Sequence, residues 1–284
     1  MEATPGIEPG YADLQSAASP LRHVASTHVP KKARQAAGGY NRKRTETTTG
    51  PVVGQGQAAY KPPTSFAGVF RMSESARFNM VETQVRTANV TDQRILAAMN
   101  AVARERFVPR TATALAYADV PVAVAPGRYL LDPRSFAKLV QLAQVKAEDR
   151  VLDVGCATGY SSAVLARLTA EVVALEQDAD LVRVASGLLA NPVGKVEVVQ
   201  GALVEGVKDH APFDVIFVNG AIEQVPESLL GQLAEGGRLV TVLKDGQSRA
   251  WLFLKENGQV GKRPDFDADV PVLAGFKKAM GFVF

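Results

Sequence analysis

Apolar and polar residues follow a regular pattern from residue 150 onward. Short apolar runs alternate with segments whose apolar residues recur at helical spacing, and these predict buried strands and helices in turn. Such an alternation predicts an α/β fold, in which a mostly parallel sheet has helices on both faces. The expected strands are residues 151–154, 172–175, 196–199, 215–218 and 239–243, and the helices between them begin near Tyr160, Ala179 and Pro226.

The pattern changes near the end of the chain. Residues 250–255 alternate between apolar and polar positions, and Glu256-Asn257-Gly258 then offers a hairpin turn before a further extended stretch. We therefore expect a C-terminal antiparallel hairpin at the end of the parallel sheet.

Residues 72–149 have a mostly helical pattern. Helices are predicted at residues 73–86 and 135–143, and Thr91 is a suitable N-cap for another helix between them. Residues 117–129 contain proline and glycine and are expected to be irregular.

Residues 1–71 differ from the rest of the chain in composition. They are rich in small residues and proline, and they carry nine Lys or Arg against four Asp or Glu, whereas residues 72–284 carry 23 against 25. Because no helical or strand period persists in residues 1–71, they are expected to be disordered, or a spurious extension upstream of a start at Met72. A targeting or nucleic-acid-binding arm is the alternative. Residues 72–284 have no basic excess, so no nucleic-acid partner is expected.

The remaining composition excludes several classes of site. Cys156 is the single cysteine and the three histidines are scattered, so neither an intrachain disulfide nor a zinc site is expected. No apolar run approaches the roughly 18 residues of a membrane span, and the N-terminus lacks the apolar segment of a secretory signal. We expect a soluble cytoplasmic protein with no bound metal and no membrane partner.

A glycine-containing turn follows the first strand of the alternating part. Asp153 lies near the end of this strand, the turn is Gly155-Cys156-Ala157-Thr158-Gly159, and Glu176 ends the next strand. Glycine lets the backbone come close to a ligand, and a carboxylate at the second strand end can accept both hydroxyls of a ribose. The dinucleotide pattern G-x-G-x-x-G is not met, since Ala157 and Tyr160 replace its later glycines. A structural turn in another α/β fold is the alternative.

This turn resembles the D/E-x-G-x-x-x-G loop of Rossmann-like class I methyltransferases, which bind S-adenosyl-L-methionine. The resemblance implies that the acid before the loop lies near the amino-acid end of this cofactor and that Glu176 holds its ribose. The cofactor-binding residues implied in this way are Asp153, Gly155, Cys156, Ala157, Thr158, Gly159, Glu176, Gln177, Ala202 and Leu203.

Three longer segments resemble one family within that class. Residues 80–109, 116–122 and 213–240 are similar to protein-L-isoaspartate O-methyltransferases, and the similarity covers nearly all of residues 72–284. The resemblance implies an enzyme that methylates the free carboxylate of isoaspartyl residues in damaged proteins, after which the ester collapses to a succinimide. We expect the protein to be a monomer. Residues 72–149 would then form the helical and substrate-loop part, and residues 150–284 the cofactor-binding sheet. An ionised carboxylate can attack the methyl group directly, so no general base is required.

The chain departs from this family in the loop expected to meet the substrate. The family pattern G-x-T-I-S-x-P is read here from Gly127 to Pro133, with Tyr129 and Leu131 in place of the two hydroxyl residues. The family's G-D-G has become Gly201-Ala202-Leu203, and residues 219–222 replace a stretch of small residues and proline. The candidates left to hold an acidic substrate are Arg128, Tyr129 and Arg134, together with Asn219; an ordinary solvated loop is the alternative.

These departures leave two other functions open. One is a class I methyltransferase with a different small or peptidic acceptor, and the other is a cofactor-binding protein without catalysis. Methylation of nucleic-acid bases is disfavoured, because residues 219–222 do not carry the Asn/Asp-Pro-Pro-aromatic motif that is typical of it.

The change of pattern at Met72 gives a first prediction. A chain of residues 72–284 is expected to keep the thermal unfolding midpoint and the cofactor affinity of the full chain, because the residues removed have no periodic apolar pattern. Thermal unfolding and calorimetry of both chains measure this. A lower midpoint or a weaker affinity after truncation would show that residues 1–71 support the fold.

Overall fold

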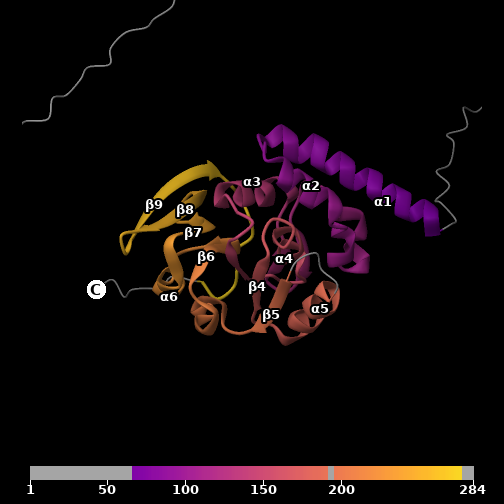
Figure 1. Cartoon of the computed structure of the whole chain (residues 1–284). Coiled ribbons are helices and arrows are strands. Elements are labelled where there is room, and N and C mark those ends of the chain that lie inside the picture. Colours follow the sequence, from indigo (N-terminus) through magenta and orange to yellow (C-terminus); the bar gives the residue numbers. More distant parts are fainter. Residues whose placement is uncertain (1–65, 191–194, 277–284) are drawn as a thin grey trace, which may run out of the picture. The chain divides into compact units, whose positions relative to one another are not determined.

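The computed structural model describes residues 66–190 and 195–276, and a seven-stranded sheet lies at its centre (Figure 1). The strand order is β5-β4-β3-β6-β7-β8-β9. Neighbours from β5 to β7 are parallel, and β8 and β9 continue the sheet as antiparallel strands. The strands are β3 (Arg150–Val154), β4 (Glu171–Glu176), β5 (Lys195–Gln200), β6 (Phe213–Ile222), β7 (Leu233–Lys244), β8 (Ser248–Glu256) and β9 (Gln259–Asp267).

The α/β fold and the terminal hairpin are thus confirmed. Each predicted strand lies within an observed one, and β6 and β7 extend several residues beyond the predicted ranges. The turn between β8 and β9 places Asn257 and Gly258 at positive φ, 53° and 75°, which is the backbone of the tight hairpin turns that Asn-Gly favours.

Helices cover both faces of the sheet. They are α1 (Phe66–Met80), α2 (Gln93–Ala101), α3 (Pro133–Ala143), α4 (Tyr160–Leu165), α5 (Ala179–Leu189) and α6 (Glu227–Gly231). Successive residues of β3 face opposite sides, so Val151 belongs to the apolar core that includes α2, α3 and α4, while Leu152 belongs to the core that includes α6. The first core includes Phe136, whose ring packs against those of Tyr160 and Phe217 at centroid distances of 5.5 and 5.7 Å.

The N-terminal helical segment is longer than predicted. Helix α1 begins at Phe66, before the predicted start at Ser73, and the chain continues through a π-helical turn (Val81–Val85) and a 3₁₀ turn (Arg86–Ala88). The helical run therefore includes the predicted residues 73–86. Residues 66–71 are therefore helical, so the expectation that they are disordered was wrong, while residues 1–65, to which the rest of that expectation applies, lie outside the described residues. The domain boundary at Met72 stays a prediction.

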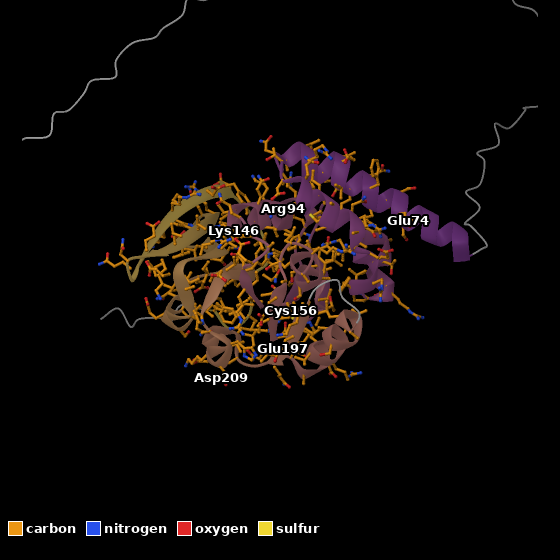
Figure 2. All side chains as sticks on the ribbon, in the orientation of Figure 1. Glu74, Arg94, Lys146, Cys156, Glu197 and Asp209 are labelled. Carbon is orange, nitrogen blue, oxygen red and sulfur yellow. The ribbon has the colours of Figure 1, made fainter. Side chains whose placement is uncertain are left out.

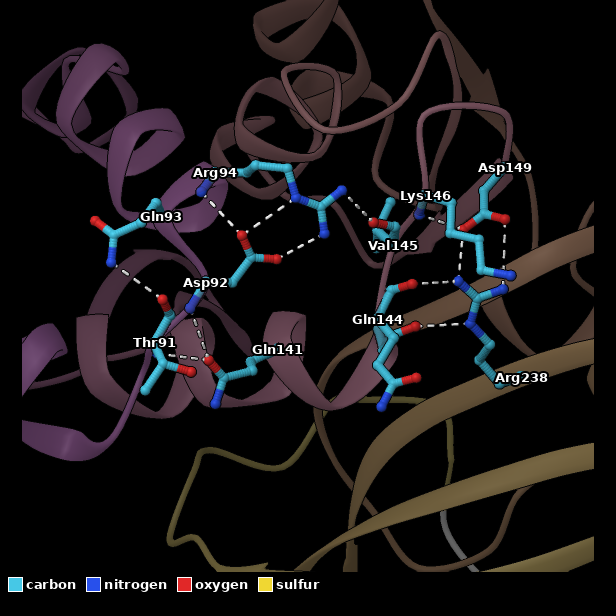
Figure 3. A network of polar contacts seen from close by, with 11 residues as sticks. Thr91, Asp92, Gln93, Arg94, Gln141, Gln144, Val145, Lys146, Asp149 and Arg238 are labelled. Atoms are coloured by element: carbon cyan, nitrogen blue, oxygen red, sulfur yellow. Dashed lines mark hydrogen bonds and ion pairs between the residues drawn. The ribbon is translucent and has the colours of Figure 1, made fainter.

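The prediction that Thr91 caps α2 was wrong by one residue. Asp92 is the N-cap, and its Oδ1 accepts a hydrogen bond from the Arg94 N–H at 2.9 Å. The Thr91 N–H donates instead to Gln141 Oε1 of α3, at 2.7 Å (Figure 3). A carboxylate is the stronger acceptor at this position, because it also pairs with the guanidinium of Arg94.

The prediction that residues 117–129 are irregular was also wrong in part. Strands β1 (Val122–Ala125) and β2 (Arg128–Leu130) form a two-stranded antiparallel ribbon within and just beyond that range. The proline and glycine lie at its turn, where Gly127 adopts a φ of 67°, while Val122 and Leu130 are buried opposite each other. This ribbon brings Arg128 to the edge of the sheet.

Arg238 of β7 fastens the connection between α3 and β3 to the sheet. Its Nη2 lies 2.5 Å from Asp149 Oδ2 and 2.6 Å from the carbonyl oxygen of Gln144, and its Nε donates to the carbonyl of Ala143 at 2.7 Å (Figure 3). The position of β3 relative to α3 is fixed by these contacts, and β3 leads directly into the glycine loop. In the part of the chain that the structure describes, no helix combines the length and apolar character needed to span a membrane.

Candidate cofactor and acceptor site

Three polar side chains meet at the carboxyl ends of neighbouring strands. Asp153 lies near the end of β3, Glu176 ends β4, and Asn219 lies in β6, which pairs with β3 on its other side. The side chains of Asp153 and Glu176 are fully buried, and Asn219 is 9% exposed. In open parallel sheets, ligands bind at this edge. The sequence-predicted strand-end residues are therefore brought together at one place.

The glycine loop connects β3 to α4 at the same edge. Gly155 and Gly159 have φ values of 74° and 95°, a conformation that other residues rarely adopt. A Cβ on Gly159 would lie 2.7 Å from Leu189 Cδ1 of α5, so this glycine is also required for packing. The N–H groups of Gly155 and Cys156 both donate to the carbonyl of Leu175, which ties the loop to β4.

The carboxylate of Glu176 accepts hydrogen bonds from both sides. Its Oε1 accepts from the N–H groups of Gln177 at 2.7 Å and Asp178 at 3.1 Å, and its Oε2 accepts from the Ala157 N–H at 3.0 Å. Arg128 Nε lies 3.0 and 3.2 Å from the two oxygens. This ion pair is nearly shielded from solvent, with 8% of the Arg128 side chain exposed and none of Glu176.

Asp153 is the centre of a buried polar cluster. Its Oδ2 accepts hydrogen bonds from Ser161 Oγ and Ser162 Oγ, both at 2.6 Å, and its Oδ1 accepts from Asn219 Nδ2. Asn219 Nδ2 also donates to Ser161 Oγ at 3.0 Å. Burial raises the pKa of Asp153 to about 6, although the hydrogen bonds from both serines and from Asn219 act in the opposite direction.

This shift predicts how Asp153 contributes to stability as pH changes. The pKa is higher in the folded state, about 6, than the ordinary 3.8, so the cost of keeping the carboxylate buried and charged is complete above pH 6 and absent below about pH 4. The two-unit difference corresponds to roughly 3 kcal/mol. We therefore expect the wild type to become more stable relative to Asp153→Asn as pH falls from 7 to 4. Urea unfolding measures the free energy of unfolding of both proteins at each pH. Parallel pH profiles for the two proteins would contradict the prediction.

The candidate acceptor residues are separated in the structure. Tyr129 and Asn219 line one small cavity, together with Leu131, Tyr160 and Ser161. Arg128 instead lies on Glu176. Arg134 lies apart from both, with 55% of its side chain exposed and an ion pair to Asp119 at 3.2 Å.

The other predicted cofactor residues surround Glu176 and the loop. Cys156 and Leu203 are buried, and burial raises the pKa of the Cys156 thiol well above its usual value, which favours a packing role over a nucleophilic one. Figure 2 labels Cys156 near the middle of the view. Gln177 and Ala202 are exposed at the ends of β4 and β5, while Thr158 is buried and donates to the carbonyl of Phe107 at 2.6 Å. Among the described residues, no group of His, Cys, Asp and Glu side chains is placed to hold a metal ion.

Comparison with known proteins gives a consistent result. Residues 75–268 match the family model described as protein-L-isoaspartate(D-aspartate) O-methyltransferase. This chain belongs to that family. Curated members named protein-L-isoaspartate O-methyltransferase include one from Koribacter versatilis, 39% identical over 65% of this chain and 84% of the relative. Another, from Methylorubrum populi, is 40% identical over 66% of this chain and 88% of the relative.

Solved structures agree with the fold. A protein-L-isoaspartate O-methyltransferase matches 72% of this chain and 67% of its own, with a TM-score of 0.61 and 24% identity. A structure described as the enzyme from Plasmodium falciparum in complex with S-adenosyl-L-homocysteine matches 69% of this chain and 97% of its own, with a TM-score of 0.60 and 22% identity. The resemblance to the isoaspartate methyltransferase family and the class I fold are thus confirmed.

Three residues around the site of this isoaspartate methyltransferase family member were not predicted from its sequence. Ser161 and Ser162 hold Asp153, and two hydroxyls in the first turn behind a strand-end acid were the available signal. Leu273 was missed because the final extended stretch has no motif. Its Cδ atoms lie 3.0 Å from where a Cβ on Gly155 would be, so Gly155 also makes room for this side chain.

Proposed function

We propose that this chain transfers the methyl group of S-adenosyl-L-methionine to the free carboxylate of isoaspartyl residues in proteins. Membership of the isoaspartate methyltransferase family, over residues 75–268, is the observation that carries the proposal. The strand-end carboxylate Glu176 beside the glycine loop supports the cofactor half of it.

The residues at the strand ends fit this cofactor. Glu176 offers a buried carboxylate that can accept from a ribose hydroxyl, and the exposed Gln177 and Ala202 with the buried Leu203 border the place expected for the adenine. Both oxygens of Asp153 accept from side chains of the protein, which supports a role in fixing the loop and Asn219. When bound, the cofactor supplies a methyl group on a positively charged sulfur.

The chain's own contribution to the reaction is to position the acceptor and to exclude water. A carboxylate is ionised at neutral pH, so it attacks without a general base, and a correct approach supplies most of the rate. The small cavity lined by Tyr129 and Asn219 is also walled by Leu131 and the rings of Phe136 and Tyr160, and its volume of about 10 Å³ means that these side chains have to move apart before a carboxylate can enter. We propose this cavity as the place where the reacting carboxylate enters.

The test is methyl transfer from labelled S-adenosyl-L-methionine to an isoaspartyl peptide, beside the same peptide with an ordinary aspartyl residue. We expect label only in the isoaspartyl peptide, because the family acts on that linkage. Binding of S-adenosyl-L-homocysteine is measured by calorimetry in the same preparation. A protein that binds this product but methylates neither peptide would overturn the proposed acceptor.

A methyltransferase with another carboxylate acceptor is the second candidate, and one observation favours it. Leu131 takes the place of the family's serine, is 4% exposed and offers no hydroxyl to a substrate. Methylation of peptides with a free C-terminal carboxylate or a glutamate side chain, without methylation of the isoaspartyl peptide, would support this candidate.

A further inference from the structure

The ion pair between Arg128 and Glu176 occupies the carboxylate that the proposed function assigns to the ribose. The Oε1 atom accepts from Arg128 and from two backbone N–H groups, and the Oε2 atom accepts from Arg128 and from the Ala157 N–H. A carboxylate has about four lone-pair positions. Four N–H groups make these five contacts, so Glu176 has no position for a ribose hydroxyl while Arg128 stays in place, and release of Arg128 frees one position, on Oε2.

The backbone donors to Glu176 belong to the loop and to the turn after β4, and they cannot leave without unfolding those segments. Arg128 is the partner that can leave, because it comes from the short ribbon of β1 and β2 and reaches Glu176 through a flexible side chain. One further hydrogen bond holds its guanidinium within the described part, from Nη1 to the carbonyl of Gly127 at 3.2 Å.

A released Arg128 would need another anion. Its guanidinium is largely shielded from solvent, and a buried charge without a partner is unfavourable. Arg128 is not among the residues that line the cavity proposed for the acceptor, but Leu130, which faces the same side of β2 as Arg128, lines it together with Tyr129 and Leu131. An ionised acceptor carboxylate entering this cavity presents the planar anion that a guanidinium binds best.

We propose that Arg128 exchanges partners during binding: it holds Glu176 in the unliganded protein, is displaced by the ribose of the cofactor, and then binds the carboxylate of the acceptor. This inference rests on the proposed function and adds a residue for acceptor binding and an order of binding to it. Arg128 supplies the cationic contact where the serine of the family is replaced by Leu131. Cofactor and acceptor therefore strengthen each other's binding, since each favours the same position of Arg128.

The test compares wild type, Arg128→Met and Arg128→Lys in calorimetric titration with S-adenosyl-L-homocysteine. Methionine keeps the length of the side chain without its charge, so Glu176 is free before the ligand arrives. We expect Arg128→Met to bind S-adenosyl-L-homocysteine about tenfold more tightly than wild type, because no ion pair has to open. Arg128→Lys is expected to lie between the two. Arg134→Met is the matched control, since it removes an arginine of the same segment that pairs with Asp119, and its affinity should stay at the wild-type value.

A second measurement tests the other half of the exchange. An isoaspartyl peptide is expected to raise the affinity of wild type for S-adenosyl-L-homocysteine and to leave that of Arg128→Met unchanged. In the methylation assay, Arg128→Met should raise KM for the peptide by about tenfold or more. Thermal unfolding verifies that each variant is folded. If Arg128→Met is not folded, the affinities and KM of Arg128→Lys are compared with those of wild type instead.

Two outcomes would overturn the exchange. A folded Arg128→Met that binds S-adenosyl-L-homocysteine as wild type does, or more weakly, would mean that Arg128 does not compete with the ribose. If the peptide raises the affinity for S-adenosyl-L-homocysteine equally in wild type and in Arg128→Met, Arg128 does not bind the acceptor. A wild type that binds no S-adenosyl-L-homocysteine would overturn the proposed function together with this inference, which separates the two kinds of failure.

Discussion

Replacing Arg104 with methionine is expected to lower the free energy of unfolding by about 2–4 kcal/mol. Arg104 is fully buried, and its Nε and Nη2 donate to the carbonyls of Ala116 at 2.7 Å and Leu131 at 2.6 Å. The guanidinium also lies 4.6 Å from the ring centroid of Tyr160, the first residue of α4. Methionine can fill part of the space, but it leaves both carbonyls without these donors and removes the charge from the ring face.

Urea unfolding at constant pH measures this effect. Arg106→Met is the matched control, because Arg106 is exposed in the same 3₁₀ turn, and a change within about 0.5 kcal/mol is expected there. Arg104→Lys keeps the charge but not the planar fork that reaches two carbonyls, so an intermediate loss is expected. A loss below about 1 kcal/mol for Arg104→Met would show that the segments that carry Ala116 and Leu131 are held by other contacts.

The same contacts connect the acceptor loop to the cofactor loop. Arg104 binds the carbonyl of Leu131 on one side and packs on Tyr160 on the other. Because Tyr160 directly follows the glycine loop, Arg104 fixes the distance between the place of the cofactor and the proposed acceptor cavity. Its role is one of positioning, whereas Arg128 is proposed to touch the acceptor itself.

The sheet and the strand-end residues could be predicted from the sequence, because both depend on the local pattern of apolar residues. Short apolar runs identify β3 and β4 as strands that are buried on both faces, and a parallel sheet then places Asp153 and Glu176 at one edge. The glycine positions could be predicted for the same reason, since the positive φ of Gly155 and Gly159 is a property of the turn itself.

The contacts of the arginines could not be predicted from local pattern. Arg128 meets Glu176 only because residues 122–130 fold into a ribbon, and the two residues are 48 positions apart in the chain. Arg104 lies in a short 3₁₀ turn, where an arginine is ordinarily exposed. It is buried because carbonyls from two distant loops and one ring surround it, and such a surrounding exists only in the folded chain.

Glu176→Ala is expected to weaken binding of S-adenosyl-L-homocysteine by roughly 10- to 150-fold. The carboxylate is assigned to the ribose, and a hydrogen bond to a charged group contributes about 1.5–3 kcal/mol. Glu176→Gln keeps the shape and loses the charge, so a smaller loss is expected. Glu171→Ala is the control: it lies at the other end of β4 and forms ion pairs with Arg150 and Lys195. An unchanged affinity in a folded Glu176→Ala would remove Glu176 from the cofactor site.

The size of this loss depends on Arg128 if the two residues exchange partners. In wild type, the ribose gains Glu176 only after the ion pair at 3.0 Å has opened, so the measured affinity contains both effects. In Arg128→Met there is no pair to open, and the same Glu176→Ala change should cost more affinity. The loss of binding free energy on Glu176→Ala is therefore smaller in wild type than in Arg128→Met. The difference is the free energy of the ion pair, which a double-mutant cycle measures as a coupling energy. Equal losses in the two backgrounds would mean that Glu176 binds the ribose without releasing Arg128.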